Sequence, residues 1–322
     1  MVFIAVETVA YNSLYKVALD SVRCYIAGTD YELKIVDVFN DTRVIEACSE
    51  YKTVYFRKHC AARLYLEDTD WMFVMDADTG IVNPNHCIEE YIDARVNMIF
   101  YERFFNWEIA CGNYLARNSE FAKDFLKRWA DYEHLELGGS WWKGFDNGPL
   151  HIVALESLFP KESQEVRNCH KIWYTSVGYE TYIPYVICVR IYLGATRIFP
   201  GKFKLLRRAH SFCRDWYHTG DAWCDKDFMI HGWKARNVNE KGWASPFRQD
   251  FDLTKCAADY NGWPWRNEKH VKCIDLKPMV SGGERGSANA LPKQFIVIPF
   301  LNQSDIGECY PDCDIRERIH GL

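Results

Sequence analysis

Three features that mark other protein classes are missing from this 322-residue sequence. It has no uninterrupted apolar run of about 18 residues, the length that a membrane-spanning helix needs. It has no basic excess, because the net charge is −5 and the pI is near 6.1, which argues against a nucleic-acid partner. It also lacks the paired CxxC spacing of a structural zinc site. We therefore expect no transmembrane segment, no nucleic acid and no zinc finger.

What is present is typical of a large globular protein, with 48% hydrophobic and 26% charged residues. The aromatic content is 16% and there are 13 cysteines. We interpret the early cysteines, which lie in apolar segments, as ordinary core residues. The late ones lie in loop-rich sequence where disulfides would help: Cys213, Cys224, Cys256, Cys273, Cys309 and Cys313. The odd count leaves at least one thiol unpaired within the chain, and two sequons, at Asn40 and Asn302, are compatible with a lumenal or secreted setting.

Residues 1 to about 160 alternate strand-like and helix-like patterns, which predicts an α/β fold with a mixed, mainly parallel sheet flanked by helices. We expect strands at 2–6, 33–39, 71–75 and 97–101. We expect helices at 14–27, 56–66, 86–95, 120–132, with Ser119 as N-cap, and 146–158. Further on, 185–192 predicts a strand, 281–289 a flexible linker and 295–300 a last strand. We place a catalytic domain at 1–240 and an irregular, aromatic-rich extension at 241–322.

One acidic motif stands out by its context. The sequence contains five Asp-x-Asp triplets, but only Asp76-Ala77-Asp78 directly follows a strongly apolar strand, 71–75. The carboxyl ends of parallel strands form the ligand-binding edge of such a sheet. Two carboxylates this close repel each other unless a cation lies between them, and carboxylates are preferred ligands of Mg²⁺ and Mn²⁺. The alternative is a turn with two solvated acids and Gly80 as its turn residue.

A second motif, His231-Gly232-Trp233-Lys234, strengthens the metal interpretation. A neutral imidazole can complete a Mn²⁺ site that carboxylates begin. Gly232 lets a diphosphate approach the backbone, and Lys234 supplies a cation for a phosphate oxygen. A single histidine taken alone is more often structural, so the prediction depends on the combination with Asp76 and Asp78.

Together these motifs resemble the GT-A fold of glycosyltransferases that use nucleotide-diphospho-sugars. The nearest relatives in pattern are the retaining glycogenin-like and galactosyl-, xylosyl- or mannosyltransferase-like families, and a poorly characterised animal family of predicted transferases. The stretch 71–84 is similar to their metal-binding strand, 110–118 to a segment near the acceptor, and 145–150 to an Asp-Gln/Asn element beside the donor sugar. The resemblance covers about residues 1–240.

The resemblance implies roles for individual residues. Asp76, Asp78 and His231 would hold Mn²⁺ or Mg²⁺, which bridges the UDP diphosphate, and Asp146 and Asn147 would face the donor sugar as catalytic residues. Nucleotide contacts would come from Glu7, Thr8 and Tyr11 after the first strand, and from Ala77 in the acidic motif. On the basic helix before the metal-binding strand the candidates are Arg57 and Arg63, with Lys58 beside them. Gly232 and Lys234 of the second motif would complete the set. Asn147 stands where the family more often has Gln, which bears on the retaining assignment.

The implied activity is transfer of a hexose or pentose from a UDP-sugar to a glycan or glycoprotein acceptor, with retention. The alternative is a non-catalytic lumenal protein that binds nucleotide-sugars or glycans on the same fold. A nucleotidyltransferase would need a Gly-rich basic loop after the first strand, which this sequence lacks. The resemblance also implies the lumen of the secretory pathway, mainly the Golgi. The abrupt first strand without a signal peptide suggests a lost or trimmed anchor and, without one, secretion.

Overall fold

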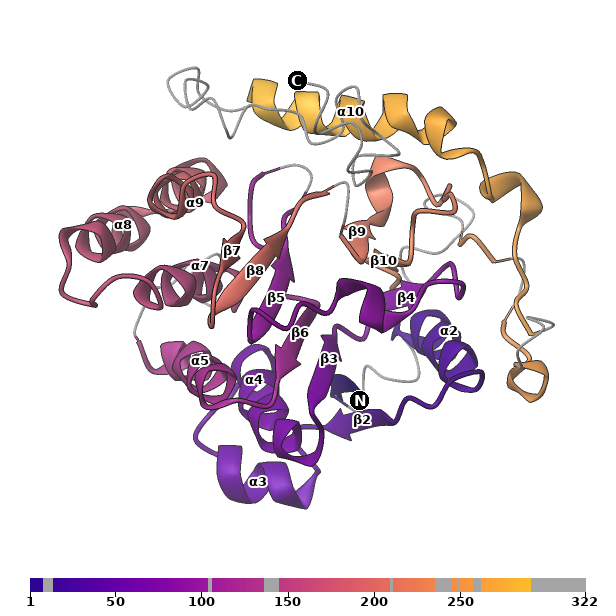
Figure 1. The fold of residues 1–322 in the computed structure, drawn as a ribbon, viewed down its shortest axis with the longest axis horizontal. Coiled ribbons are helices and arrows are strands. Elements are labelled where there is room, and N and C mark those ends of the chain that lie inside the picture. Colours follow the sequence, from indigo (N-terminus) through magenta and orange to yellow (C-terminus); the bar gives the residue numbers. More distant parts are fainter. Residues whose placement is uncertain are drawn as a thin grey trace.

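The computed structural model describes residues 1–7, 14–103, 106–135, 145–208, 211–234, 245–247, 250–256 and 262–290. Its centre is a seven-stranded sheet in the order β2-β1-β3-β6-β5-β8-β7 (Figure 1). The strands are β1 (Val2–Val6), β2 (Leu33–Asp37), β3 (Trp71–Met75), β5 (Met98–Tyr101), β6 (Tyr114–Arg117), β7 (Ile198–Phe199) and β8 (Phe203–Leu206). A second sheet, in the order β4-β10-β9, contains β4 (Thr79–Ile81), β9 (Cys213–Asp215) and β10 (Met229–His231).

The large sheet is mixed and mainly parallel, as the alternating sequence pattern predicts. Strands β2, β1, β3, β5 and β8 run in one direction, whereas β6 and β7 run against their neighbours. The carboxyl ends of β1, β3 and β5 therefore meet at one edge of the sheet. Glu7, Asp76 and Arg103 all follow these ends, so the topology gathers charged side chains from three distant parts of the chain.

Helices cover both faces of this sheet (Figure 1). One face carries α3 (Thr42–Cys48), α4 (Val54–Tyr65), α5 (Glu120–Asp131), α7 (Asn147–Glu156), α8 (Gln164–Thr175) and α9 (Tyr179–Leu193). The other face carries α2 (Lys16–Ile26) and the small sheet. Short 3₁₀ turns lie at Leu66–Asp68, Ile88–Tyr91, Tyr132–His134, Trp216–His218, Leu253–Lys255 and Asn267–Lys269.

Strand side chains alternate between the two hydrophobic cores, as the pleat requires. Met72 and Val74 of β3 pack in the core under α4 and α5, whereas Phe73 and Met75 pack in the core under α2. This burial on both faces explains why β3 reads as a continuous apolar run. Ser119 caps α5 as predicted, since its side chain accepts a hydrogen bond from the Ala122 N–H.

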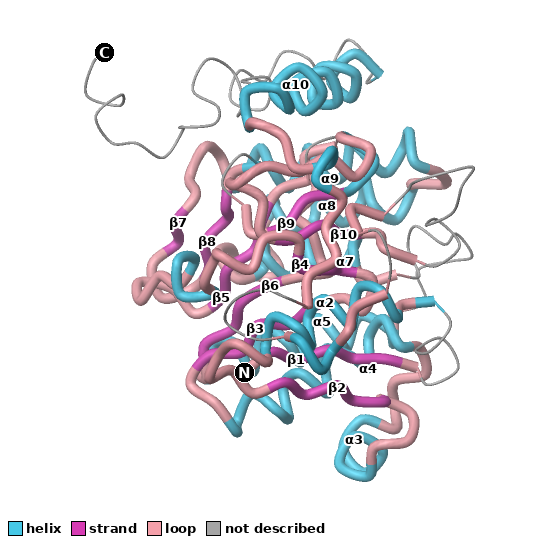
Figure 2. The backbone as a smooth tube through the Cα atoms, turned by 90° about the vertical axis from the view of Figure 1, so that its right-hand side faces the viewer, coloured by secondary structure: helices cyan, strands magenta, loops and turns pink. Residues whose placement is uncertain are grey.

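The last described helix, α10 (Cys273–Ala290), lies at the end of the molecule opposite α3 (Figure 2). Disulfides fasten the C-terminal segment to the body of the protein, because Cys256 pairs with Cys24 of α2 and Cys273 pairs with Cys224. Two more bonds, Cys48–Cys60 and Cys169–Cys188, join neighbouring helices. The four disulfides among the described residues are compatible with a lumenal or secreted protein. Among the described residues, no helix combines the length and apolarity that crossing a bilayer demands.

Several local predictions are wrong. Residues 185–192, predicted as a strand, belong to α9, and 281–289, predicted as a flexible linker, belong to α10. Only Ile88–Tyr91 of the predicted helix 86–95 is helical, as a 3₁₀ turn. The early cysteines at 24, 48, 60, 169 and 188 form disulfides, whereas Cys213 from the late group is a buried free thiol. The predicted strand 295–300, Cys309 and Cys313 lie outside the described residues. The domain boundary at 240 stays a prediction.

Candidate active site

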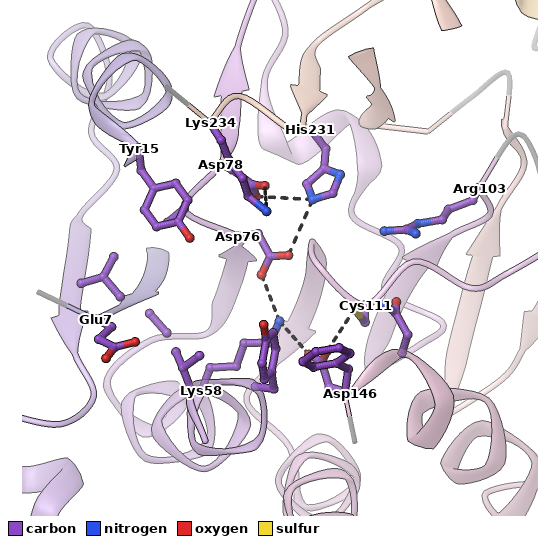
Figure 3. A pocket seen from close by; sticks show the side chains of 17 residues that line it. Glu7, Tyr15, Lys58, Asp76, Asp78, Arg103, Cys111, Asp146, His231 and Lys234 are labelled. Atoms are coloured by element: carbon purple, nitrogen blue, oxygen red, sulfur yellow. Dashed lines mark hydrogen bonds and ion pairs between the residues drawn. The ribbon is translucent and has the colours of Figure 1, made fainter. Parts of the chain in front are cut away.

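The pocket at this sheet edge has a volume of about 280 Å³. It lies between the ends of β1 and β3, the first turns of α4 and the start of α7 (Figure 3). Acidic and basic side chains both line it, and Arg103 reaches toward it from the side opposite Glu7. The predicted site residues among its lining are Glu7, Asp76, Ala77, Asp78, Asp146, Asn147, His231 and Lys234.

Asp76, Asp78 and His231 converge although His231 is more than 150 residues away in the sequence. Each offers one ligand atom, and these atoms all lie within 4.8 Å of one another. Pairing of β10 with β4 sets His231 opposite Thr79, so the imidazole lies beside the Asp-x-Asp turn. The His231 Nε2 atom is 3.4 Å from an Asp78 oxygen and 3.8 Å from an Asp76 oxygen.

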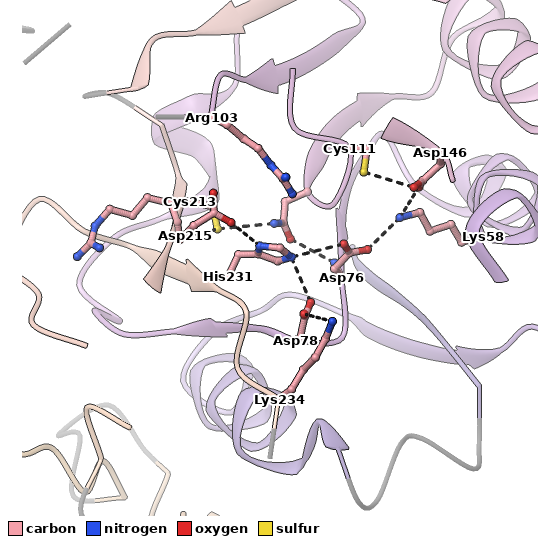
Figure 4. Close-up of polar contacts among 12 residues, drawn as sticks. Lys58, Asp76, Asp78, Arg103, Cys111, Asp146, Cys213, Asp215, His231 and Lys234 are labelled. Carbon is pink, nitrogen blue, oxygen red and sulfur yellow. Dashed lines mark hydrogen bonds and ion pairs between the residues drawn. The ribbon is translucent and has the colours of Figure 1, made fainter. Parts of the chain in front are cut away.

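A third carboxylate, that of Asp215, orients the histidine. Strand β9 pairs with β10 so that Asp215 lies opposite His231, and the His231 Nδ1 atom is 2.8 Å from Asp215 Oδ1 (Figure 4). A metal-bound histidine usually donates its other ring N–H to a carboxylate in this way, which leaves Nε2 for the metal. Two carboxylates, one imidazole and a supporting carboxylate fit Mn²⁺ or Mg²⁺ in ligand chemistry.

Glycine is required next to this cluster. A Cβ atom on Gly112 would lie 2.4 Å from Asp76 Oδ2, so a larger residue there would displace the carboxylate. Gly232 has a φ of +105°, and its Cβ would lie 2.4 Å from the Trp216 side chain. Gly232 does not line the pocket, so this structure accounts for it by backbone geometry and packing. Its role toward a diphosphate stays a prediction.

The acidic groups are balanced by nearby cations. Lys58 Nζ lies 2.9 Å from Asp76 and 2.7 Å from Asp146, and Lys234 Nζ lies 3.3 Å from Asp78. Burial raises the pKa of Asp76. Burial also acts to raise the pKa of Asp78, but His231 and Lys234 outweigh it and hold that pKa well below its usual range. The pocket therefore keeps Asp78 ionised, and its two lysines can meet an anionic ligand.

Of the three basic residues considered on α4, Arg57, Lys58 and Arg63, only Lys58 lines the pocket. Lys58 enters the pocket together with Val54 and Tyr55. Arg57 and Arg63 do not line it, because they point from other sides of the helix, and the Arg57 guanidinium lies over the Phe39 ring. Lys58 lies one helical turn after Val54, so the two side chains lie on the same face of α4. This spacing is the signal that distinguishes Lys58 from Arg57 and Arg63. Thr8 and Tyr11 lie outside the described residues.

Sequence reasoning missed other side chains of the site. Pocket-lining residues without a predicted role include Tyr15, Tyr55, Arg103, Cys111 and Phe145. Arg103 is the second residue after β5, so its position after a parallel strand was a usable signal. Cys111 Sγ lies 3.4 Å from Asp146 Oδ1, a contact between distant segments that no local pattern announces.

Comparison with protein families gives one match over most of the chain. A family described as "Protein of unknown function, DUF273" matches residues 22–244. The chain belongs to this family. The match to DUF273 contains Lys58, Asp76, Asp78, Asp146 and His231. Most of the pocket lining therefore lies within the matched segment, whereas Ala5, Val6, Glu7 and Tyr15 precede it.

Comparison with individual proteins adds little to the DUF273 assignment. No curated protein sequence matches the chain. Among solved structures, the chain is similar to a glycosyltransferase "involved in the glycosylation of the major capsid of PBCV-1", with 13% identity and a TM-score of 0.38. That similarity covers 71% of this chain and 92% of the other.

The buried histidines predict a pH-dependent stability. His59 and His151 have no exposed surface, and burial lowers the pKa of each to about 4. Since an unfolded histidine binds a proton near pH 6.5, unfolding takes up protons between pH 6.5 and 4 and stability falls as the pH falls. We expect each histidine to remove roughly 3 kcal/mol over this interval, measured by urea unfolding at several pH values. A free energy of unfolding that stays constant from pH 6.5 to 4.5 would contradict this assignment.

Proposed function

We propose that this protein is a metal-dependent glycosyltransferase of the GT-A type. It would move a hexose or pentose from a UDP-sugar to a glycan or glycoprotein acceptor. The observation that carries the proposal is the convergence of Asp76, Asp78 and His231 within 4.8 Å at the pocket, with Asp215 behind the histidine. The mainly parallel sheet also supports the proposal, because ligands bind at the carboxyl ends of parallel strands.

The residues of the chain divide the work as follows. Asp76, Asp78 and His231 would hold Mn²⁺ or Mg²⁺, which supplies Lewis-acid stabilisation of the leaving diphosphate. Lys58 and Lys234 would neutralise further phosphate charge, since their ammonium groups lie beside the metal-binding carboxylates. Glu7, at the end of β1, would contact the nucleoside.

Asp146 would stabilise the positive charge that develops on the sugar carbon as the glycosidic bond breaks. Burial acts to raise the pKa of Asp146, but Lys58 and His59 outweigh it and hold that pKa well below its usual range. The carboxylate is therefore ionised at neutral pH. Asn147, whose Oδ1 atom is buried without a hydrogen-bond partner within the described residues, would bind a sugar hydroxyl. Retention, with the acceptor attacking from the leaving-group side, belongs to the proposal, as does the Golgi lumen as its setting.

Nucleotide release tests this function directly. The full chain is incubated with separate UDP- and GDP-sugars and Mn²⁺, with and without glycan acceptors, and free nucleotide is measured. We expect release from at least one UDP-sugar, lost on adding EDTA. Metal-dependent binding without release under any condition would instead favour the non-catalytic binding protein, and neither binding nor release would refute both readings.

A further inference from the structure

The carboxylate of Asp146 is held by side chains from two sides. Its Oδ2 atom accepts hydrogen bonds from Lys58 Nζ at 2.7 Å and from His59 Nε2 at 3.0 Å. Cys111 lies against Oδ1, and Figures 3 and 4 show the contacts of Lys58 and Cys111 with Asp146. Lys58, Cys111 and Asp146 line the pocket, whereas His59 does not. The hydrogen bond to Asp146 therefore connects His59 to the pocket.

His59 is itself fixed by the hydrophobic core. Its side chain has no exposed surface and stacks on Trp129 with ring centroids 3.5 Å apart. The same indole donates from Nε1 to the backbone carbonyl of Asp146 at 2.9 Å. Trp129 thus sets the plane of the imidazole and the position of the Asp146 backbone together.

The hydrogen bonds determine which ring nitrogen of His59 carries the proton. Asp146 is ionised and can only accept, so His59 Nε2 must donate to it. His59 Nδ1 then has a free lone pair, which lies 3.1 Å from the Tyr114 hydroxyl. Tyr114 is fully buried and burial raises the pKa of its hydroxyl, so it keeps its proton and donates it to Nδ1. The hydrogen bonds therefore run in one direction: Tyr114 donates to His59, and His59 donates to Asp146.

We propose that Tyr114 and His59 are positioning residues that orient Asp146 for the sugar-transfer step. The inference rests on the proposed function. Asp146 requires the His59 tautomer with hydrogen on Nε2, and Tyr114 holds the imidazole by donating to its Nδ1. His59 in turn fixes the second lone-pair direction of Asp146 Oδ2 beside Lys58. Asp146 is then held ionised and immobile, as preorganised electrostatic stabilisation requires.

Space filling alone does not require this arrangement. Burying an imidazole and a phenol without exposed surface costs free energy unless each polar atom finds a partner. An aliphatic side chain would fill the same space beside Trp129 without that requirement. Here both ring nitrogens of His59 have partners, and the series ends on a pocket carboxylate rather than in the core.

Kinetic variants test the positioning role. We expect His59→Leu, which has no donor, to lower kcat about 10- to 100-fold, while the KM for the UDP-sugar stays within about twofold. His59→Gln, whose amide can still donate to Asp146, should recover most of kcat. Tyr114→Phe should lower kcat by a smaller factor, with metal and nucleotide binding intact. Equal losses in Leu and Gln variants, or a loss confined to KM, would overturn the proposal.

The tautomer is tested without any activity. In the wild-type protein, ¹⁵N NMR of the histidine rings should show His59 with hydrogen on Nε2 and a bare Nδ1 at pH 7. In Tyr114→Phe, Asp146 still accepts from Nε2, so the hydrogen should stay on Nε2 while the Nδ1 resonance shifts because Nδ1 has lost its donor. A wild-type His59 that carries hydrogen on Nδ1, or on both nitrogens, would refute the positioning series. Failure of the glycosyltransferase assay with the predicted tautomer present would instead refute only the proposed function.

Discussion

Replacing Asp78 with asparagine is expected to abolish metal-dependent binding of the nucleotide-sugar. Asp78 is buried and lies against both His231 and Lys234. Asparagine keeps the size of the side chain but removes the charge that a divalent cation requires. Changes in the outer shell of a metal site alone cost about 10- to 100-fold in affinity, so loss of a direct ligand should cost at least about 100-fold. Calorimetric titration with Mn²⁺, with and without UDP, measures the effect.

The chain offers a matched control for this variant. Asp68-Thr69-Asp70 is the same kind of triplet at the opposite end of β3, and Asp70 is exposed. Asp70→Asn should leave Mn²⁺ affinity unchanged. Circular dichroism should show both variants folded. Equal Mn²⁺ affinity in the wild type and the Asp78→Asn variant would remove the metal assignment.

The position of Asp76 and Asp78 was predictable because the signals for it lie within one short stretch of sequence. Trp71–Met75 is apolar without interruption, and a strand buried on both faces needs that composition. Two acids directly after such a strand lie at the ligand edge, and this placement needs no knowledge of distant contacts. His231 and Lys234 were identified in the same way, from residue types within four positions of one another.

The supporting residues were not predictable because strand pairing and burial bring them in. Asp215 reaches His231 only through the pairing of β9 with β10, and His59 reaches Asp146 across 87 positions of the sequence. A single histidine in a helix carries no local signal of a role. Only its contacts with Tyr114 and Asp146 connect it to the pocket.

The errors in secondary structure have a similar cause. Helix α9 has buried residues on all sides, so its sequence shows no polar face and its β-branched run reads as a strand. Residues 281–289 have the composition of a linker, yet α10 is anchored at its start by the Cys224–Cys273 bond and packs Leu276 and Val280 against Cys224. Tertiary contacts override local propensity in both segments.

A second large effect is expected in stability, at a buried group of charges that contains none of the proposed metal ligands. Glu102 follows β5 and has 1% of its surface exposed. It forms ion pairs with Arg190 of α9, which is equally buried, and with Arg197, and it lies near Arg208. Because one carboxylate faces several arginines, Glu102→Gln leaves buried positive charge uncompensated. We expect a loss of about 3–5 kcal/mol in the free energy of unfolding, and a fall in Tm on the order of 10 °C.

A matched surface pair separates charge burial from ion pairing itself. Glu120 forms an ion pair with Lys123, but its side chain is 94% exposed, so Glu120→Gln should cost less than about 1 kcal/mol. Adding Arg190→Met to Glu102→Gln should recover part of the lost stability, since it removes one of the unpaired buried charges. If the double variant were less stable than Glu102→Gln alone, packing of the Arg190 stem rather than its charge would hold α9 against the sheet.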